Sequence, residues 1–162
     1  MQRRNLFRRC MYLGKVEQLF LGRFEHAIDE KGRMTIPSRF REEVGDVAVL
    51  TRAFDRNLTV MPQAVFDSLA ERLTELSVTD PEARLLQRLI FANAIPVEFD
   101  KAGRILIPQY LREQAQLHGQ AVVVGQGKQF EIWAPELWEE QVNQQNSPAT
   151  AQRFKELNLP LR

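Results

Sequence analysis

Cationic side chains gather in two short segments of the sequence. The first has no acidic residue between positions 31 and 41, and its cations are Lys31, Arg33, Arg39 and Arg41. The second carries Lys101, Arg104 and Arg112. Lysine and arginine bind phosphate oxygens, and arginine can also donate two hydrogen bonds to the edge of a guanine. Both segments are therefore candidates for contact with DNA.

The same arginines could instead serve the fold through ion pairs. In that interpretation Arg33 pairs with Asp29 across a turn. Arg41 would pair with Glu42 or Glu43. The two roles are compatible, because a carboxylate can orient a guanidinium for a bidentate contact with guanine. The residue types alone leave both roles open.

Two aspartates, Asp29 and Asp100, could form a pair of carboxylates for acid–base catalysis. Each is followed three residues later by a glycine, Gly32 or Gly103, which catalysis does not require. An aspartate that accepts hydrogen bonds from nearby backbone amides, followed by a glycine that tolerates a positive φ, is typical of a turn. We therefore expect both aspartates to cap turns.

Other candidate catalytic or metal-binding residues are isolated. His26 and His118 do not occupy matching positions relative to the two basic segments, and Cys10 lies near the N-terminus. Residues 125–128 (GQGK) lack the spacing of a phosphate-binding loop and are expected to form a hairpin turn. The single cysteine excludes a disulfide framework or a cysteine-rich zinc site, and it points to a reducing, cytoplasmic compartment. No metal site, cofactor, small-molecule substrate or enzymatic activity is predicted.

The two basic segments belong to an internal repeat. Residues 26–42 read HAIDEKGRMTIPSRFRE and residues 97–113 read VEFDKAGRILIPQYLRE, at a constant offset of 71. Seven positions are identical, among them the aspartate, glycine and arginine of each turn and an Ile-Pro pair. The sequence therefore predicts two copies of one unit of about 50 residues.

Each unit is expected to contain strands, a short helix and a final helix. Alternating polar and apolar side chains predict a strand at 23–28, and turn residues separate it from a second strand at 33–36. Pro37 suits the first turn of a short helix, because proline lacks the amide that would have no partner there. Further strands are expected at 47–50, 58–61, 122–124 and 130–133, and longer helices at 63–76 and 136–145.

A helix is also predicted between the two units. Asp80 is a suitable N-cap, Pro81 fits the first helical position, and the helix is expected to run to about Ala92. Together with the helix at 63–76 it would form a helical hairpin. Residues 146–162 contain two prolines and are expected to form a mostly loose tail.

The chain as a whole is expected to be an α+β protein. A unit of this size buries little surface alone, so two intertwined units that share one core are favoured over separate domains. The content of 44% hydrophobic residues, with only 8 Gly and 8 Pro among 162 residues, argues against bulk disorder. No apolar segment approaches the ~20 residues that a membrane-spanning helix needs.

The net charge of +1 conceals an uneven distribution. Residues 1–19 carry a net charge of +4, which leaves residues 20–162 at −3. A mildly acidic body is not typical of a protein that binds nucleic acid over its whole surface, so DNA would be bound through a local patch repeated in space. Residues 1–19 lack the apolar core of a secretory signal, and we expect them to be a disordered basic extension.

The motif D-x-x-G-R-x-x-I-P, which occurs at 29–37 and again at 100–108, resembles the MraZ family of bacterial proteins. The similarity runs from Phe20 to about Val142, and Arg84–Leu89 is similar to the linking helix of that family. The resemblance implies two tandem AbrB-like units with swapped β-hairpins. The boundaries expected are 23–70 and 94–137 for the units, 71–93 for the linking helices and 138–162 for a C-terminal helix and tail.

Members of that family are DNA-binding transcriptional regulators of a cell-division and cell-wall gene cluster, and they typically repress their own operon. They form rings and associate with the nucleoid. The resemblance implies double-stranded promoter DNA and further copies of this chain as partners. The residues expected to contact DNA are Lys31, Arg33, Arg39, Arg41, Lys101 and Arg104. The alternative is an oligomeric scaffold for protein partners that does not read DNA sequence.

Overall fold

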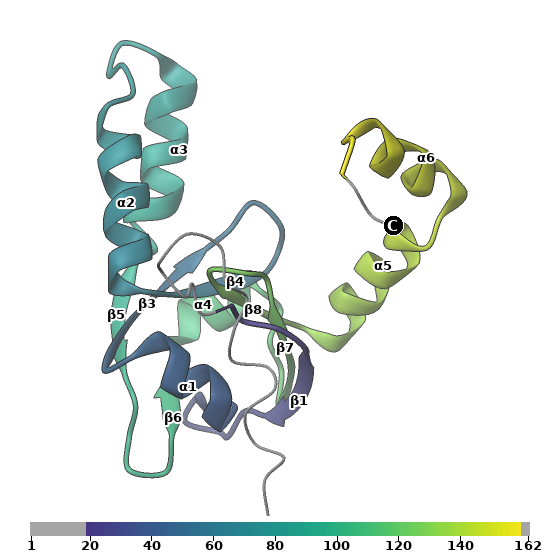
Figure 1. Cartoon of the computed structure of the whole chain (residues 1–162). Helices are drawn as coiled ribbons and strands as arrows, with labels where there is room; N and C mark the ends of the chain where they lie inside the picture. The colour runs from purple at the N-terminus through teal and green to yellow at the C-terminus, as the bar shows by residue number, and fades with distance from the viewer. Residues whose placement is uncertain (1–18, 160–162) are drawn as a thin grey trace, which may run out of the picture.

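Residues 19–159 are described by a computed structural model of the chain (Figure 1). The predicted basic extension therefore lies, except for Leu19, outside the described residues. The first unit consists of β1 (Arg23–Ala27), β2 (Arg33–Thr35), α1 (Ser38–Val44), β3 (Val47–Arg52), β4 (Leu58–Pro62) and α2 (Gln63–Thr74). After α3 (Pro81–Phe91) the second unit consists of β5 (Ile95–Glu98), β6 (Arg104–Leu106), α4 (Gln109–Gln114), β7 (Gln120–Gly125), β8 (Phe130–Trp133) and α5 (Pro135–Gln145). A last helix, α6, spans Pro148–Glu156.

The two units exchange their first strands. The main sheet has the order β1-β7-β8-β4-β3-β5, so β1 pairs with β7 of the second unit and β5 pairs with β3 of the first. The second strands, β2 and β6, form a separate two-stranded ribbon. All of these pairs are antiparallel. The predicted α+β fold, with two intertwined units that share one core, is confirmed.

If each strand is replaced by its equivalent in the other unit, the sheet order is the same read from the opposite edge. The molecule therefore has an approximate internal two-fold axis. In the main sheet this axis passes between β4 and β8, where Thr59 faces Glu131. In the ribbon it passes between Met34 and Ile105. Equivalent residues of the two units therefore lie at related places around one centre.

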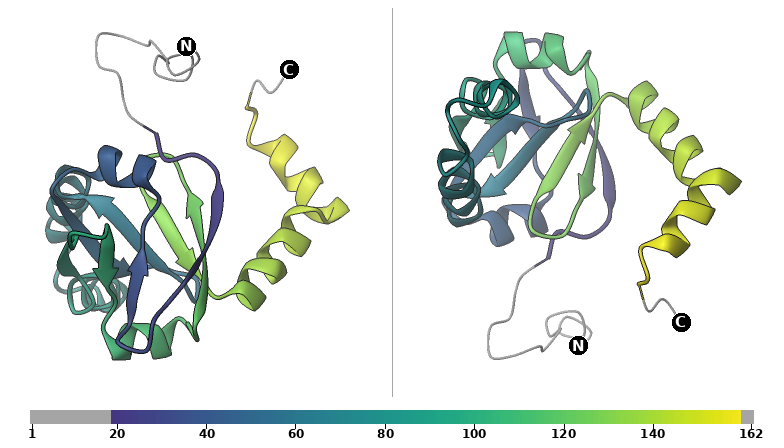
Figure 2. Two further views of the ribbon diagram at one scale, coloured as in Figure 1. Left: turned by 90° about the horizontal axis from the view of Figure 1, so that it is seen from below. Right: turned by 90° about the horizontal axis from the view of Figure 1, so that it is seen from above.

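The core lies between the main sheet and the ribbon. Met34 and Ile105 point inward from the ribbon and are fully buried, as are Phe40 of α1 and Leu111 of α4. The ring centroids of Phe40 and of Phe130 in β8 lie 5.1 Å apart. This shared core fixes the ribbon against the sheet, with the two short helices beside it (Figure 2).

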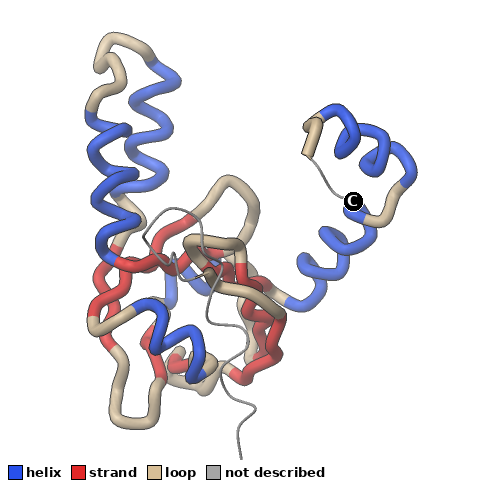
Figure 3. The backbone as a smooth tube through the Cα atoms, in the orientation of Figure 1, coloured by secondary structure: helices blue, strands red, loops and turns tan. Residues whose placement is uncertain are grey.

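The predicted helical hairpin is confirmed and covers the other face of the sheet at β3 and β4. Helices α2 and α3 lie side by side (Figure 3), and the Thr51 hydroxyl of β3 donates to the carbonyl oxygen of Ile90 at 2.9 Å. The Asp80 carboxylate accepts a hydrogen bond from the Glu82 amide at 2.9 Å and caps α3 as expected.

The prediction of a mostly loose C-terminal tail is wrong for residues 148–156, which form α6. The Ser147 hydroxyl accepts a hydrogen bond from the Thr150 amide at 3.2 Å, and Pro148 occupies the first helical turn. Proline there removes an amide that has no helical partner, so it begins this helix instead of preventing it. Helices α5 and α6 project away from the sheet (Figure 2).

Candidate nucleic-acid interface

The turn between β1 and β2 is organised by one carboxylate. Oδ1 of Asp29 accepts hydrogen bonds from the backbone amides of Lys31 at 3.0 Å and Arg33 at 2.9 Å. Oδ2 of the same residue accepts from Nε of Arg33 at 2.7 Å. Gly32 has a φ of +83°, a conformation that favours glycine. The aspartate therefore caps its turn and fixes the guanidinium of the arginine that follows.

The turn between β5 and β6 repeats this geometry. Oδ1 of Asp100 accepts from the amides of Ala102 and Arg104, both at 2.9 Å. Oδ2 accepts from Nε of Arg104 at 2.8 Å, and Gly103 has a φ of +72°. The expectation that both aspartates cap turns is confirmed. The alternative in which Arg33 pairs with Asp29 is also correct, and it leaves the far end of the guanidinium able to donate elsewhere.

The local electrostatics keep both aspartates charged. The pKa of Asp29 is lowered chiefly by the hydrogen bond from the Arg33 backbone amide, with a further contribution from the Arg33 side chain. The pKa of Asp100 is lowered in the same way by Arg104. A carboxylate with a lowered pKa is a weak proton acceptor at neutral pH, so neither residue is suited to act as a general base there.

The ribbon brings the two arginines onto one surface. In its register Arg33 faces Leu106, and Thr35 faces Arg104. Side chains of a strand alternate between its two faces, so these four residues share the outer face while Met34 and Ile105 lie in the core. Nη1 of Arg104 is 4.0 Å from Oδ2 of Asp29. The two strands of the ribbon therefore present one continuous outer surface beside the two Asp–Arg turns. We call this surface the ribbon face, and it consists of Arg33, Thr35, Arg104 and Leu106.

Thr35 and Leu106 on the ribbon face were not among the residues predicted to form the site. The signal that identifies them is the two-residue alternation, which places each on the same side as the arginine of its own strand. The pairing of β2 with β6 is needed as well, because it joins the two pairs of side chains into one surface.

Three further residues that were predicted to contact DNA are exposed. Lys31 lies in the first turn, Lys101 in the second turn and Arg39 on α1. None of these three cations has a lysine or arginine at the symmetry-related position of the other unit. At the corresponding positions the other unit has Ala102, Glu30 and Tyr110, respectively.

Arg41, the remaining predicted cation, is tied to its own unit and lies against the turn of the second unit. Its Nε donates to the carbonyl oxygen of Ile36 at 3.1 Å, and its guanidinium lies against Gly103. Arg112 of α4 makes the same arrangement, donating to the Ile107 carbonyl oxygen at 3.1 Å and lying against Gly32. Within residues 19–159 no ion pair joins Arg41 to a glutamate, so the predicted pairing with Glu42 or Glu43 is wrong.

The remaining isolated candidates do not form a second site. His26 is half-buried in β1 opposite Ala121, and burial lowers its pKa. Residues 125–128 form the predicted hairpin turn, in which the Gln126 amide donates to the Gln129 carbonyl oxygen at 2.9 Å. Cys10 lies outside the described residues. In the part of the chain that the structure describes, no group of three histidine, cysteine or acidic residues is placed to hold a metal ion.

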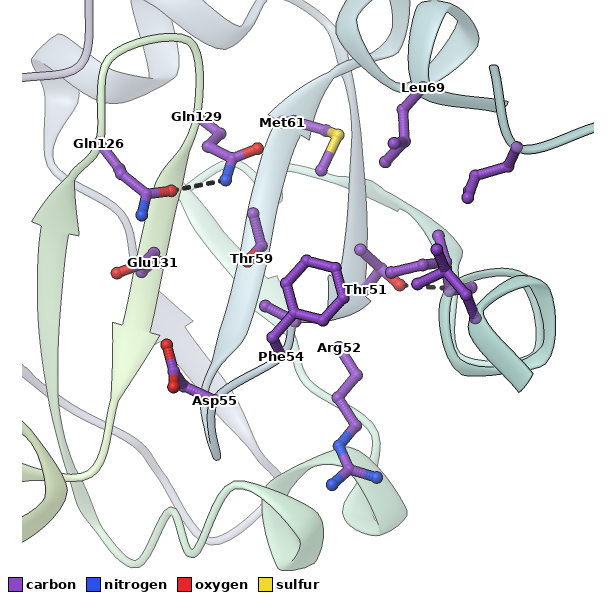
Figure 4. Close-up of a pocket in the computed structure, with 14 residues that line it drawn as sticks. Thr51, Arg52, Phe54, Asp55, Thr59, Met61, Leu69, Gln126, Gln129 and Glu131 are labelled. Carbon is purple, nitrogen blue, oxygen red and sulfur yellow. Dashed lines mark hydrogen bonds between the residues drawn. The ribbon is translucent and has the colours of Figure 1, made fainter. Parts of the chain in front are cut away.

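A cavity of about 400 Å³ lies on the sheet face opposite the ribbon, between the α2–α3 hairpin and the β7–β8 turn (Figure 4). Its lining includes Phe54, Met61, Leu69 and Glu131. Burial raises the pKa of Glu131, and its Oε2 accepts a hydrogen bond from Nε1 of Trp133 at 2.9 Å. None of the predicted cations lines this cavity. Among residues 19–159, no helix is long and apolar enough to cross a membrane.

Comparison with known proteins identifies relatives over nearly all of the described residues. A family model described as "MraZ protein, putative antitoxin-like" matches residues 19–89 and again 90–158. A protein of Thermomicrobium roseum named "Transcriptional regulator MraZ" is 49% identical over 141 residues, which are 86% of this chain and 99% of the relative. A protein of the same name from Roseiflexus castenholzii is 44% identical over 143 residues, 87% of this chain and 100% of the relative.

Proposed function

The chain belongs to the MraZ family, and we propose that it is a sequence-specific DNA-binding regulator of transcription. We further propose that it represses its own division and cell-wall gene cluster, in the cytoplasm and in association with the nucleoid. The observation that carries the proposal is the ribbon face, on which Arg33 and Arg104 are each held by an aspartate through Nε. No enzymatic activity, cofactor or small-molecule substrate is part of it.

The ribbon face suits the major groove of DNA. That groove admits a two-stranded β-ribbon, and arginine is the residue that most often reads guanine there. With Nε bound to an aspartate, Arg33 and Arg104 keep their terminal nitrogens for the O6 and N7 atoms of a base. The exposed Lys31, Arg39 and Lys101 would bind phosphates and fix the orientation of the ribbon.

Assembly into a ring-like homo-oligomer supplies the affinity in this proposal. Residues 20–162 carry a net charge of −3, so one subunit presents a small basic patch in a mildly repulsive field. Such a patch alone corresponds to non-specific dissociation constants of ~10⁻⁴–10⁻⁶ M at physiological salt. Several linked patches on several promoter boxes raise the affinity by ~10²–10⁴, provided that the spacing of the boxes fits the assembly.

The test is a binding titration of the purified chain on its own upstream region. One fragment carries a single repeated box, a second carries several boxes, and a third has ~5 bp inserted between boxes to rotate the next box to the far side of the duplex. We expect tight binding to the second fragment alone. Equal affinity for all three would contradict the multivalent mechanism, and affinity no better than for unrelated DNA would contradict sequence-specific binding.

A second candidate is an oligomeric scaffold for protein partners. It is favoured by one observation, the exposure of Leu106 (57%) and Tyr110 (42%) in the second unit. Apolar side chains mark a protein interface where they form a contiguous exposed patch. The salt dependence of promoter binding separates the two functions, because phosphate contacts release counterions and a scaffold makes none.

A further inference from the structure

Two equivalent arginines cross between the units. Arg41 belongs to α1 of the first unit and lies on the turn of the second, while Arg112 belongs to α4 of the second unit and lies on the turn of the first. Each is tied to its own unit by a hydrogen bond from Nε, to the carbonyl oxygen of Ile36 or Ile107, both at 3.1 Å. Each guanidinium is thus fixed at its base by one unit and covers the turn glycine of the other.

The two guanidinium groups pack closely against the two glycines. A Cβ atom on Gly103 would lie 2.5 Å from Cζ and Nη1 of Arg41. A Cβ atom on Gly32 would lie 2.8 Å from Nε of Arg112 and 2.7 Å from the carbonyl oxygen of Ile107. Both glycines are buried and have a positive φ, a conformation that favours glycine. At Gly32 the backbone oxygen of Ile107 excludes a Cβ atom as well, whereas at Gly103 only the end of the Arg41 side chain would have to move.

A backbone hydrogen bond accompanies each arginine. The Ile36 amide donates to the carbonyl oxygen of Gly103 at 3.1 Å, and the Ile107 amide donates to that of Gly32 at 2.9 Å. Ile36 and Ile107, whose carbonyl oxygens accept from the arginines, therefore also donate from their amides to the turn of the opposite unit. Each Asp–Arg turn is held in place by the opposite unit, in addition to the aspartate within it.

We propose that Arg41 and Arg112 are positioning residues for DNA reading, and that they act across the units. Arg112 holds the first turn and thereby Arg33, whereas Arg41 holds the second turn and thereby Arg104. The dependence is crossed because the strands of the two units are exchanged. This inference rests on the proposed function, and it assigns Arg41 a role under the ribbon face in place of a direct contact with DNA.

Chemistry distinguishes this role from a phosphate contact. A lysine at position 112 keeps the positive charge but has neither the planar guanidinium nor Nε, so it can bind a phosphate but cannot hold the turn. We therefore expect Arg112→Lys and Arg112→Ala to lose specific affinity alike, by ~10-fold or more, because reading a base needs tight placement of the side chain. The slope of log affinity against log salt would stay unchanged, whereas loss of one phosphate contact would reduce it by ~0.9.

The experiment uses the full chain with Arg112→Lys, Arg41→Lys and their combinations with Arg33→Ala and Arg104→Ala. Affinity is measured for the multi-box promoter fragment and for an unrelated duplex of equal length, with circular dichroism and oligomeric state as controls of folding. Arg112→Lys should add little to the loss caused by Arg33→Ala, since both remove the same contact. It should add fully to the loss caused by Arg104→Ala. Arg41→Lys should give the reverse pattern, and it serves as the matched control.

Amide hydrogen exchange without DNA gives an independent readout. Arg112→Lys should accelerate exchange at the amides of Lys31 and Arg33, and leave those of Ala102 and Arg104 unchanged. Normal affinity of the lysine variants, additive losses in every combination, or equal exchange in the two turns would overturn the proposal. Absence of specific binding by the unmodified chain would refute the proposed function, and the exchange pattern would still show whether the arginines hold the turns.

Discussion

The two units share one turn geometry and differ in what surrounds it. The Nε–Oδ2 distance is 2.7 Å between Arg33 and Asp29 and 2.8 Å between Arg104 and Asp100. The exposed or half-exposed residues nearby are Lys31, Thr35 and Arg39 in the first unit and Ala102, Leu106 and Tyr110 at the same positions in the second. At these three positions the first unit therefore has polar and charged side chains and the second has Ala, Leu and Tyr, although the second turn keeps one exposed cation, Lys101.

This contrast separates the residues that build the reading surface from those that tune it. The aspartate, glycine and arginine of each turn, and the arginine that crosses from the other unit, make the same contacts in both copies because the shared core imposes the same backbone. Residues on the outside are under no such constraint. We therefore expect unequal contributions to DNA binding from two turns of equal structure. Two binding experiments test this expectation, and two stability experiments test what the units have in common.

The largest effect is expected from the arginines of the ribbon face. Arg33→Ala should lower affinity for the promoter fragment by ~10–100-fold, since a bidentate contact of arginine with guanine contributes ~1–3 kcal/mol. Arg104→Ala should cost less, because the second unit offers one exposed cation for phosphates, Lys101, where the first offers two, Lys31 and Arg39. Fluorescence anisotropy measures both, with oligomeric state as the control. Equal losses would remove the functional distinction between the units.

A second experiment exchanges the charge between the turns. Lys31→Ala should flatten the slope of log affinity against log salt by ~0.9, the amount for one lost phosphate contact. Ala102→Lys should steepen it by a similar amount if the second turn also approaches the backbone of DNA. Titrations at several salt concentrations decide the matter. A steeper slope for Ala102→Lys together with unchanged slope for Lys31→Ala would reverse the roles of the two units.

The third experiment concerns stability where the units meet, at Thr59 and Glu131. Burial raises the pKa of Glu131 above its ordinary value of 4.5. The folded state therefore binds the proton of this carboxyl group more tightly than the unfolded state, and the protein loses stability as the pH rises above 4.5 and the group ionises. Glu131→Gln keeps an oxygen that can accept from Trp133 and removes the charge. Its melting temperature should exceed that of the unmodified chain at pH 7 and match it near pH 4. A gain at both values would assign the effect to something other than ionisation.

The smallest effect, and the one expected to be equal in the two units, is that of the capping carboxylates. The lowered pKa of Asp29 and Asp100 means that each stabilises the fold above the ordinary value of 3.8, and that this stabilisation is lost as the pH falls through the lowered pKa. Asp29→Asn and Asp100→Asn keep Oδ1 but lose the charge that faces Nε. Denaturant titrations from pH 7 to pH 2 should show each variant converging with the unmodified chain at low pH. Convergence for one variant only would mean that the two turns are not alike.

Local patterns were sufficient to predict most elements and both turns. The spacing of Asp29 and Gly32 predicted the cap, and Asp80-Pro81 predicted the start of α3, because these depend on neighbours in the sequence. The placement of Arg41 on Gly103 could not be predicted in this way, since it follows from the exchange of strands between units. The exchange itself was expected only from two small units needing one core and from the family resemblance. Helix α6 was missed because Pro148 was taken to oppose a helix and not to begin one.

The exchanged strands also bear on how the protein forms during its synthesis. Strand β1 pairs with β7, about 100 residues later in the chain, and the sheet of the first unit is completed only by β5 of the second. At translation rates of ~5–20 residues per second, β1 leaves the ribosome several seconds before its partner exists. The first half of the nascent chain therefore emerges with an unpaired strand and an apolar face that nothing yet covers. During that interval its unpaired edge is open to pairing with the strands of other chains.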